Sequence, residues 1–126
     1  MSLALKQLVE NVKTDERVLA VLLFGSQARG EAHARSDTDV CLVLAPNSDT
    51  PDESANVRLT YVSSFDLDLH VFQALPLPVR PRVLKDGEVL FCRNSDQLYD
   101  IALRTIREYR DFRPRYQLYL NQIANA

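Results

Sequence analysis

The sequence has few of the residues that mark zinc-binding or disulfide-linked proteins. It contains only two cysteines, Cys41 and Cys92, with no CxxC or other metal-ligand spacing around either. We expect both to be core thiols of a protein in a reducing compartment. Its two histidines, His33 and His70, also lack a companion His or Cys at ligand spacing, which argues against a zinc site. By strand parity His70 shares a face with Asp66 and Asp68 and would border a cleft there, but packing or solvent exposure is the simpler interpretation.

Long apolar runs are missing as well. No run approaches the roughly 18 residues that a membrane span needs, and the N-terminus has no charged region before an apolar stretch. We therefore expect a cytoplasmic protein that does not cross a membrane. The 126 residues fit one domain over residues 1–126, with a core over about 15–92 and a C-terminal helical segment over about 94–121. Internal repeats and low-complexity tracts are absent.

Strong net charge is the third absence. The formal net charge of −2 argues against a surface that binds nucleic acid throughout, and we expect no stable nucleic-acid binding. The charge is uneven, because residues 80–126 hold nine Lys and Arg against six Asp and Glu. This basic part is equally consistent with an acidic partner, with RNA and with a solvated helix face.

Hydrophobic periodicity predicts an α+β (mixed α/β) fold in which helices flank a small β-sheet. Residues 17–24 form an apolar run typical of a strand buried on both faces, and a short helix would follow Gly25. Further strands are expected at residues 37–44, 65–73 and 88–92. Helices are expected at residues 2–13, at 52–63 by default, and from residue 94 onward. Another helix should begin at Pro76 and Pro78, run to Lys85 and stop at Asp86-Gly87.

The turn after the first strand has the composition of a phosphate site. Gly25 lets the backbone approach a ligand closely, and Ser26 offers a hydroxyl group and an N–H group to phosphate oxygens. A helix that begins there would favour anions at its N-terminus. Taken alone, Gly25-Ser26 is also an ordinary strand-to-helix turn. Arg29 would contact a phosphate or a partner, or would pair with Glu31 or Asp37 on the surface.

Two alternating carboxylates open the next strand. Asp37 and Asp39 are two residues apart, so on a strand their side chains point to the same face. Like charges about 4 Å apart repel by roughly 4 kcal/mol at an effective dielectric constant of 20, so the pair needs a cation, a shared proton or open solvent. Carboxylate oxygens suit Mg²⁺ or Mn²⁺. Alone, the two acids could lie in an exposed loop. Ser36 belongs to the same site, where it would cap or position the Asp37 turn.

A third acidic pair, Asp66 and Asp68, lies in a later strand-like segment. If that strand pairs beside the Asp37/Asp39 strand, one of its two carboxylates completes a three-carboxylate metal site. We prefer Asp68 because it is nearer to the hydrophobic run through Val71. The role of Asp66 stays open.

Together these residues carry a resemblance. Gly25-Ser26, Gly30, the pattern Ser36-Asp37-x-Asp39 and a later strand Asp resemble the DNA polymerase β-type nucleotidyltransferase superfamily. The amino-acid sequence of residues 25–30 and 82–91 more specifically resembles the minimal nucleotidyltransferase (MntA-type) antitoxins that are paired with HEPN toxins.

The resemblance implies a polymerase β-like fold and a protein adenylyltransferase that uses ATP and two Mg²⁺ or Mn²⁺ ions. Its catalytic and metal-binding residues would be Asp37, Asp39 and Asp68. Its acceptor would be a tyrosine of a cognate HEPN ribonuclease toxin, and it would form homo-oligomers or hetero-oligomers with that toxin. Two alternatives remain: an antitoxin that acts by binding alone, and a nucleotidyltransferase that modifies a small molecule, as aminoglycoside-modifying relatives do.

Overall fold

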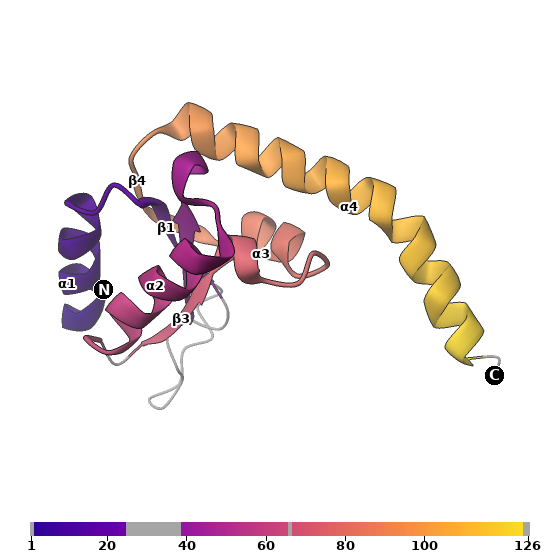
Figure 1. Cartoon of the computed structure of the whole chain (residues 1–126), viewed down its shortest axis with the longest axis horizontal. Helices are drawn as coiled ribbons and strands as arrows, with labels where there is room; N and C mark the ends of the chain where they lie inside the picture. The colour runs from indigo at the N-terminus through magenta and orange to yellow at the C-terminus, as the bar shows by residue number, and fades with distance from the viewer. Residues whose placement is uncertain (1, 25–38, 66, 125–126) are drawn as a thin grey trace.

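Helices and strands alternate along most of the chain in the computed structural model, which describes residues 2–24, 39–65 and 67–124 (Figure 1). The elements are α1 (Leu3–Lys13), β1 (Val18–Phe24), β2 (Asp39–Leu44), α2 (Pro51–Val62), β3 (Asp68–Val71), α3 (Arg80–Asp86), β4 (Glu88–Cys92) and α4 (Ser95–Ala124). Short 3₁₀ helices follow β2 and β3 at Pro46–Ser48 and Phe72–Ala74. The predicted α+β class is confirmed, while the predicted helix after Gly25 lies outside the described residues.

The four strands form one mixed sheet in the order β3-β2-β1-β4. β1 pairs antiparallel with both β2 and β4, whereas β2 and β3 are parallel. Residues Val18 to Leu23 of β1 are all buried, which confirms the prediction of a strand covered on both faces. A run of branched apolar residues suits this central position because neither face of the strand meets water.

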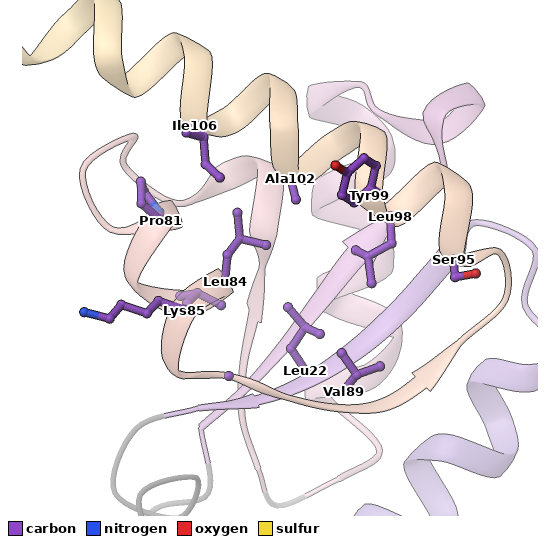
Figure 2. Close-up of a pocket in the computed structure, with 12 residues that line it drawn as sticks. Leu22, Pro81, Leu84, Lys85, Val89, Ser95, Leu98, Tyr99, Ala102 and Ile106 are labelled. Carbon is purple, nitrogen blue, oxygen red and sulfur yellow. The ribbon is translucent and has the colours of Figure 1, made fainter.

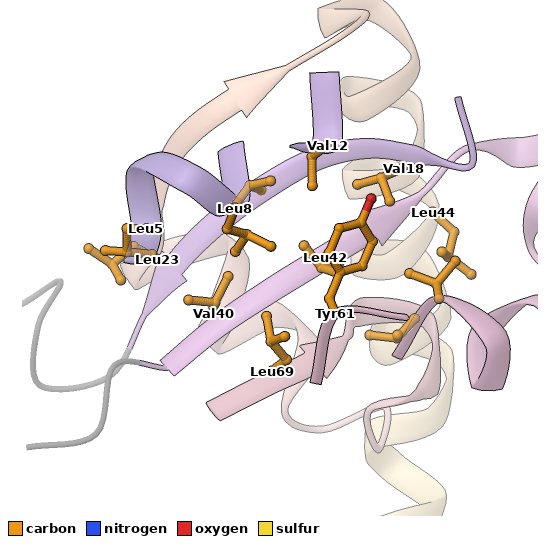
Figure 3. Close-up of a cluster of buried hydrophobic side chains, with 13 residues drawn as sticks. Leu5, Leu8, Val12, Val18, Leu23, Val40, Leu42, Leu44, Tyr61 and Leu69 are labelled. Carbon is orange, nitrogen blue, oxygen red and sulfur yellow. The ribbon is translucent and has the colours of Figure 1, made fainter. Parts of the chain in front are cut away.

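Each face of the sheet has its own apolar core. On one face the sheet packs against α1 and α2, and residues Leu8, Leu42 and Tyr61 lie in that core (Figure 3). On the other face, Leu22 and Cys41 pack with Val83 of α3 and Ile101 of α4. The two cores follow from the period of two along a strand, which sends successive side chains to opposite faces.

The Arg93 side chain links the end of α1 to the start of β1 through hydrogen bonds. Its guanidinium group donates hydrogen bonds to the carbonyl oxygens of Val12, Lys13, Asp15 and Val18 at 2.8–3.2 Å. The last carbonyl groups of a helix have no partner within the helix, so this side chain satisfies groups that would otherwise need water.

The third strand is shorter than predicted. Residues 65–73 were expected to be extended, but β3 covers only Asp68–Val71 and Phe72–Ala74 is a 3₁₀ helix. The Gln73 side chain explains the early end of the ladder. Its amide accepts a hydrogen bond from the Leu44 N–H group and donates one to the Leu44 carbonyl oxygen, both at 3.0 Å, so a side chain satisfies the end of β2.

The third helix begins later than predicted. It starts at Arg80 rather than at Pro76 or Pro78, and Leu77–Val79 form a turn. The Arg80 side chain stabilises this turn by donating hydrogen bonds to the Leu75 and Gln73 carbonyl oxygens at 2.9 and 3.1 Å. The predicted stop at Asp86-Gly87 is confirmed.

The other predicted helices are present with small shifts. Ser2 caps α1 and Thr50 caps α2 through their side-chain oxygens. The α4 helix runs to Ala124 without interruption at Pro114, and Figure 1 shows it leaving the rest of the chain in its C-terminal half. Among the described residues, no helix is both long and apolar enough to span a membrane.

The two thiols differ in their surroundings. Cys41 is fully buried, as predicted, and Cys92 is half-buried. Burial in apolar surroundings raises the pKa of the Cys41 thiol because the thiolate loses its hydration. Cys41 therefore acts as a small apolar core residue.

Candidate functional site

Two carboxylates meet where β2 and β3 begin. Asp39 is the first residue of β2, Asp68 is the first residue of β3, and the parallel register places them directly opposite each other. The expected pairing of these two strands is therefore observed. Val40 and Leu69 point into the core under α1 and α2, so the two aspartates point to the opposite face of the sheet.

His70 joins the two carboxylates. It follows Asp68 by two positions on β3, and its Nε2 atom lies 3.2 Å from Oδ1 of Asp68. Each of Asp39, Asp68 and His70 offers one ligand atom, and these atoms lie within 4.8 Å of one another. The Phe24 ring, at the end of β1, contacts the imidazole edge-on with 5.7 Å between ring centroids.

The two carboxyl groups are coupled electrostatically. The pKa of Asp68 is lowered, chiefly because its carboxylate accepts a hydrogen bond from the Asp39 carboxyl group. Partial burial acts in the opposite direction, while the neighbouring His70 and then Arg58 also lower the pKa of Asp68. Two carboxyl groups this close share a proton when no cation is bound, because neither relieves the other's charge.

The donor set fits a divalent cation. The Asp68 and His70 side chains are 45% and 32% exposed, which leaves room for water beside the protein ligands. Carboxylate oxygens with water suit Mg²⁺ and Mn²⁺, and a cation would replace the shared proton between the two aspartates. Asp39 and Asp68 are the described residues that would hold it.

Most of the predicted nucleotide site lies outside the described residues. This applies to Gly25, Ser26, Arg29, Ser36 and Asp37, and also to Asp66. Their roles stay predictions. The structure brings Asp39 and Asp68 together, and it adds a residue that sequence reasoning had assigned to packing or solvent. The available signal for His70 was its spacing of two from Asp68, which places both side chains on one face of a strand.

A second hollow in the molecule has a different character. A cavity of about 460 Å³ lies between α3, α4 and the sheet, and its lining is mostly apolar (Figure 2). Leu22, Leu84 and Leu98 point into it, and among the described residues that line it Lys85 is the only charged one. None of the described residues that line this cavity carries a carboxylate, so its chemistry differs from that of the Asp39–Asp68 site.

Residues 6–96 match the family model "Polymerase beta, Nucleotidyltransferase". The chain belongs to this nucleotidyltransferase family. The matched segment includes Asp39 and Asp68, so the paired carboxylates lie within the part of the chain that the family model covers.

One curated relative of this nucleotidyltransferase is "Putative protein adenylyltransferase MJ1547" of Methanocaldococcus jannaschii. The two sequences are 31% identical over 75 residues, which is 60% of this chain and 57% of the relative. The match therefore spans little more than half of that relative's length.

Solved structures of toxin–antitoxin complexes share the fold. A chain of a toxin–antitoxin complex with AMP-PNP superimposes with a TM-score of 0.71 at 19% identity, and the match covers 98% of this chain and 99% of the other. A chain from the complex of tri-AMPylated Shewanella oneidensis HEPN toxin with MNT antitoxin gives a TM-score of 0.68 at 17% identity, covering 97% of both chains. At these identities the likeness shows a shared fold alone, and the matches extend over 97–98% of the chain.

Proposed function

We propose that the chain is the antitoxin of a toxin–antitoxin pair and acts as a metal-dependent protein adenylyltransferase. It transfers AMP from ATP to a tyrosine hydroxyl group of a cognate HEPN ribonuclease toxin and thereby inactivates the toxin. The observation that carries the proposal is the pairing of Asp39 with Asp68 across β2 and β3 in a chain of the nucleotidyltransferase family. The named adenylyltransferase relative and the toxin–antitoxin neighbours support the choice of substrate and partner.

The cations are part of the proposal. Asp37, Asp39 and Asp68 would hold two Mg²⁺ or Mn²⁺ ions, with Asp68 on the side of the acceptor. Bound there, a divalent ion neutralises charge on the triphosphate and on the attacking oxygen. Asp39 and Asp68 supply the negative charge that makes this edge of the sheet attractive to a cation and leave exposed positions for ATP oxygens.

The remaining work of the protein is positioning and proton transfer. Gly25 and Ser26 would hold the triphosphate through backbone N–H groups and the serine hydroxyl group. The tyrosine oxygen forms a bond to the α-phosphorus of ATP while the bond from that phosphorus to the pyrophosphate oxygen breaks. The hydroxyl proton passes to the Asp68 carboxylate. Little covalent chemistry falls to the protein in such a transfer, so orientation and charge neutralisation carry most of the catalysis.

A labelling experiment tests this function. The purified chain is incubated with Mg²⁺ and α-³²P-ATP, with and without the purified HEPN protein encoded by the adjacent gene. We expect label on the HEPN protein, in a bond to tyrosine that mass spectrometry locates. Asp39→Asn and Asp68→Asn should each lower the labelling rate at least about 100-fold, since each removes a charge on which transition-state stabilisation depends.

The matched control is Asp49→Asn, an exposed acid in the loop after β2. It should label the toxin at the rate of the unchanged chain. A tight complex that blocks the ribonuclease without any label would contradict the proposal and favour an antitoxin that acts by binding alone.

A further inference from the structure

His70 is the one member of the described cluster that an all-oxygen magnesium site does not need. Its Nε2 atom lies 3.2 Å from Oδ1 of Asp68, and the Phe24 ring packs edge-on against the imidazole. On β3 it lies opposite Cys41 in register, and Cys41 is fully buried. Pairing of the edge strand β3 with β2 therefore sets the backbone position of His70, and its ring contacts an aromatic neighbour.

The separation of the two ligand atoms suits a shared ion. In an octahedral site with bonds of about 2.0–2.1 Å, adjacent ligand atoms lie about 3 Å apart. The 3.2 Å between Nε2 of His70 and Oδ1 of Asp68 is close to that value. The same distance also fits a direct hydrogen bond between the imidazole and the carboxylate. The geometry therefore permits either a bound cation or a hydrogen bond between the two side chains, and an experiment has to distinguish them.

We propose that His70 is a ligand of the cation held by Asp39 and Asp68, and that this mixed nitrogen and oxygen set makes the site selective for Mn²⁺ over Mg²⁺. The inference rests on the proposed metal site of the nucleotidyltransferase. Mg²⁺ takes oxygen ligands and keeps its water, so imidazole nitrogen is a poor ligand for it. Mn²⁺ also prefers oxygen ligands, but as a first-row transition ion it accepts one imidazole beside two carboxylates more readily than Mg²⁺ does. Replacing a water ligand by a held imidazole thus adds affinity for Mn²⁺ and little for Mg²⁺.

The test compares metal binding in the absence of nucleotide and toxin. Mn²⁺ binding is followed by the EPR signal of free Mn²⁺, and Mg²⁺ binding by its competition with Mn²⁺. We expect His70→Val, a residue that suits a strand, to weaken Mn²⁺ binding about tenfold while Mg²⁺ binding changes less than about twofold. His70→Gln is the second variant, because it keeps a polar side chain of similar reach.

Pulsed EPR supplies a direct signature. A nitrogen bound to Mn²⁺ gives a ¹⁴N modulation, which we expect in the unchanged chain and not in His70→Val. The chain has two histidines, so His33→Gln is the matched control and should keep the ¹⁴N signal. Thermal unfolding of each variant, followed by circular dichroism, shows that the compared proteins are folded.

The outcomes distinguish the proposed role of His70 from the proposed Asp39–Asp68 metal site on which it depends. Equal loss of Mn²⁺ and Mg²⁺ affinity in His70→Val, or a ¹⁴N signal that survives in it, would overturn the role of His70. Asp39→Asn should abolish binding of both ions. If both ions bind Asp39→Asn as they bind the unchanged chain, the metal site itself is wrong, and the labelling experiment then decides the function on its own.

Discussion

At the scale of the residue, Asp15 shows how a carboxylate away from the site contributes to stability. It lies between α1 and β1, accepts hydrogen bonds from Arg17 at 2.8 and 2.9 Å, and accepts one from the Tyr61 hydroxyl group at 2.6 Å. The Arg17 guanidinium group is the main cause that lowers the pKa of Asp15 to about 2. Burial, and then the hydrogen bond to Asp15, raise the pKa of Tyr61. Asp15 thus joins the start of β1 to α2.

This arrangement predicts a pH-dependent loss of stability. Because the pKa of Asp15 is lower in the folded state than in the unfolded state, its contribution is fully present above about pH 4 and declines as the pH falls toward 2. Asp15→Asn should lower the free energy of unfolding by about 2 kcal/mol at pH 7 and by much less at pH 2.5. Urea unfolding at both pH values measures this, with Asp49→Asn as the control. Equal destabilisation at the two pH values would show that ionisation of Asp15 is not the cause.

Residue choices at the candidate site were predictable where strand parity decided them. Asp39 was chosen because alternation places it on one strand face with Asp37, and Asp68 because it is nearer than Asp66 to the following apolar run. The parallel register of β2 and β3 brings the two together. His70 obeyed the same parity but was assigned to packing, because ligand spacing was sought among His and Cys alone. Asp39 and Asp68 are 29 residues apart in the sequence. Only the pairing of β2 with β3 brings Asp39 close to Asp68 and His70, and no local sequence pattern contains that information.

At the scale of the element, the junction of α3 and β4 depends on one glycine. The Gly87 N–H group donates to the Val83 carbonyl oxygen at 2.8 Å and ends α3. A Cβ atom placed on Gly87 would lie 2.4 Å from that same carbonyl oxygen. Since the obstacle is backbone rather than the tip of a flexible side chain, relief requires moving α3 or β4.

Gly87→Ala should therefore destabilise the fold. We expect the free energy of unfolding to fall by about 1–3 kcal/mol, the usual cost of forcing extra volume into a packed position. Chemical denaturation measures the change, and Ala102→Gly in α4 is a comparison that should cost only about 1 kcal/mol through helix propensity and lost packing. A Gly87→Ala variant as stable as the unchanged chain would mean that the α3–β4 turn has room that the structure does not show.

The lengths of the elements were harder to predict than their order. The apolar run through Phe72 suggested a strand to residue 73, yet the Gln73 amide bonds to Leu44 and the chain turns. Likewise Pro76 and Pro78 suggested a helix start, while Arg80 forms the hydrogen bonds that hold the preceding turn. In both cases a side chain makes a tertiary contact that ends or delays an element, and local propensity cannot foresee such a contact.

At the scale of the whole molecule, α4 divides into a packed part and a projecting part. Its buried residues are Ile101 and Thr105, and no residue after Thr105 in the described chain is buried. Beyond that point Phe112 and Tyr116 stack on each other at 5.3 Å within the helix. Large apolar side chains are exposed near its end: Leu118, Tyr119, Leu120 and Ile123. Sequence periodicity predicted one helix here and could not indicate that half of it leaves the sheet.

The stability of the domain should therefore not depend on the projecting part. A chain that ends at Phe112 keeps Ile101, Thr105 and the contact between Arg80 and Glu108 at 4.0 Å. We expect its melting temperature to lie within about 2 °C of the full chain, because the deleted residues contribute no burial against the sheet. Mn²⁺ affinity should also be unchanged, since Asp39 and Asp68 lie on the sheet.

The matched variant ends at Leu98 and removes the packed part as well. Loss of Ile101 uncovers the core under α3, so this shorter chain should melt at least about 10 °C lower or fail to fold. Thermal unfolding of the three chains at one protein concentration gives the comparison. An equal fall in melting temperature for the chains ending at Phe112 and at Leu98 would contradict this prediction and show that the projecting part stabilises the domain. If it did so by contacting a second copy of the chain, the melting temperature of the full chain would rise with protein concentration.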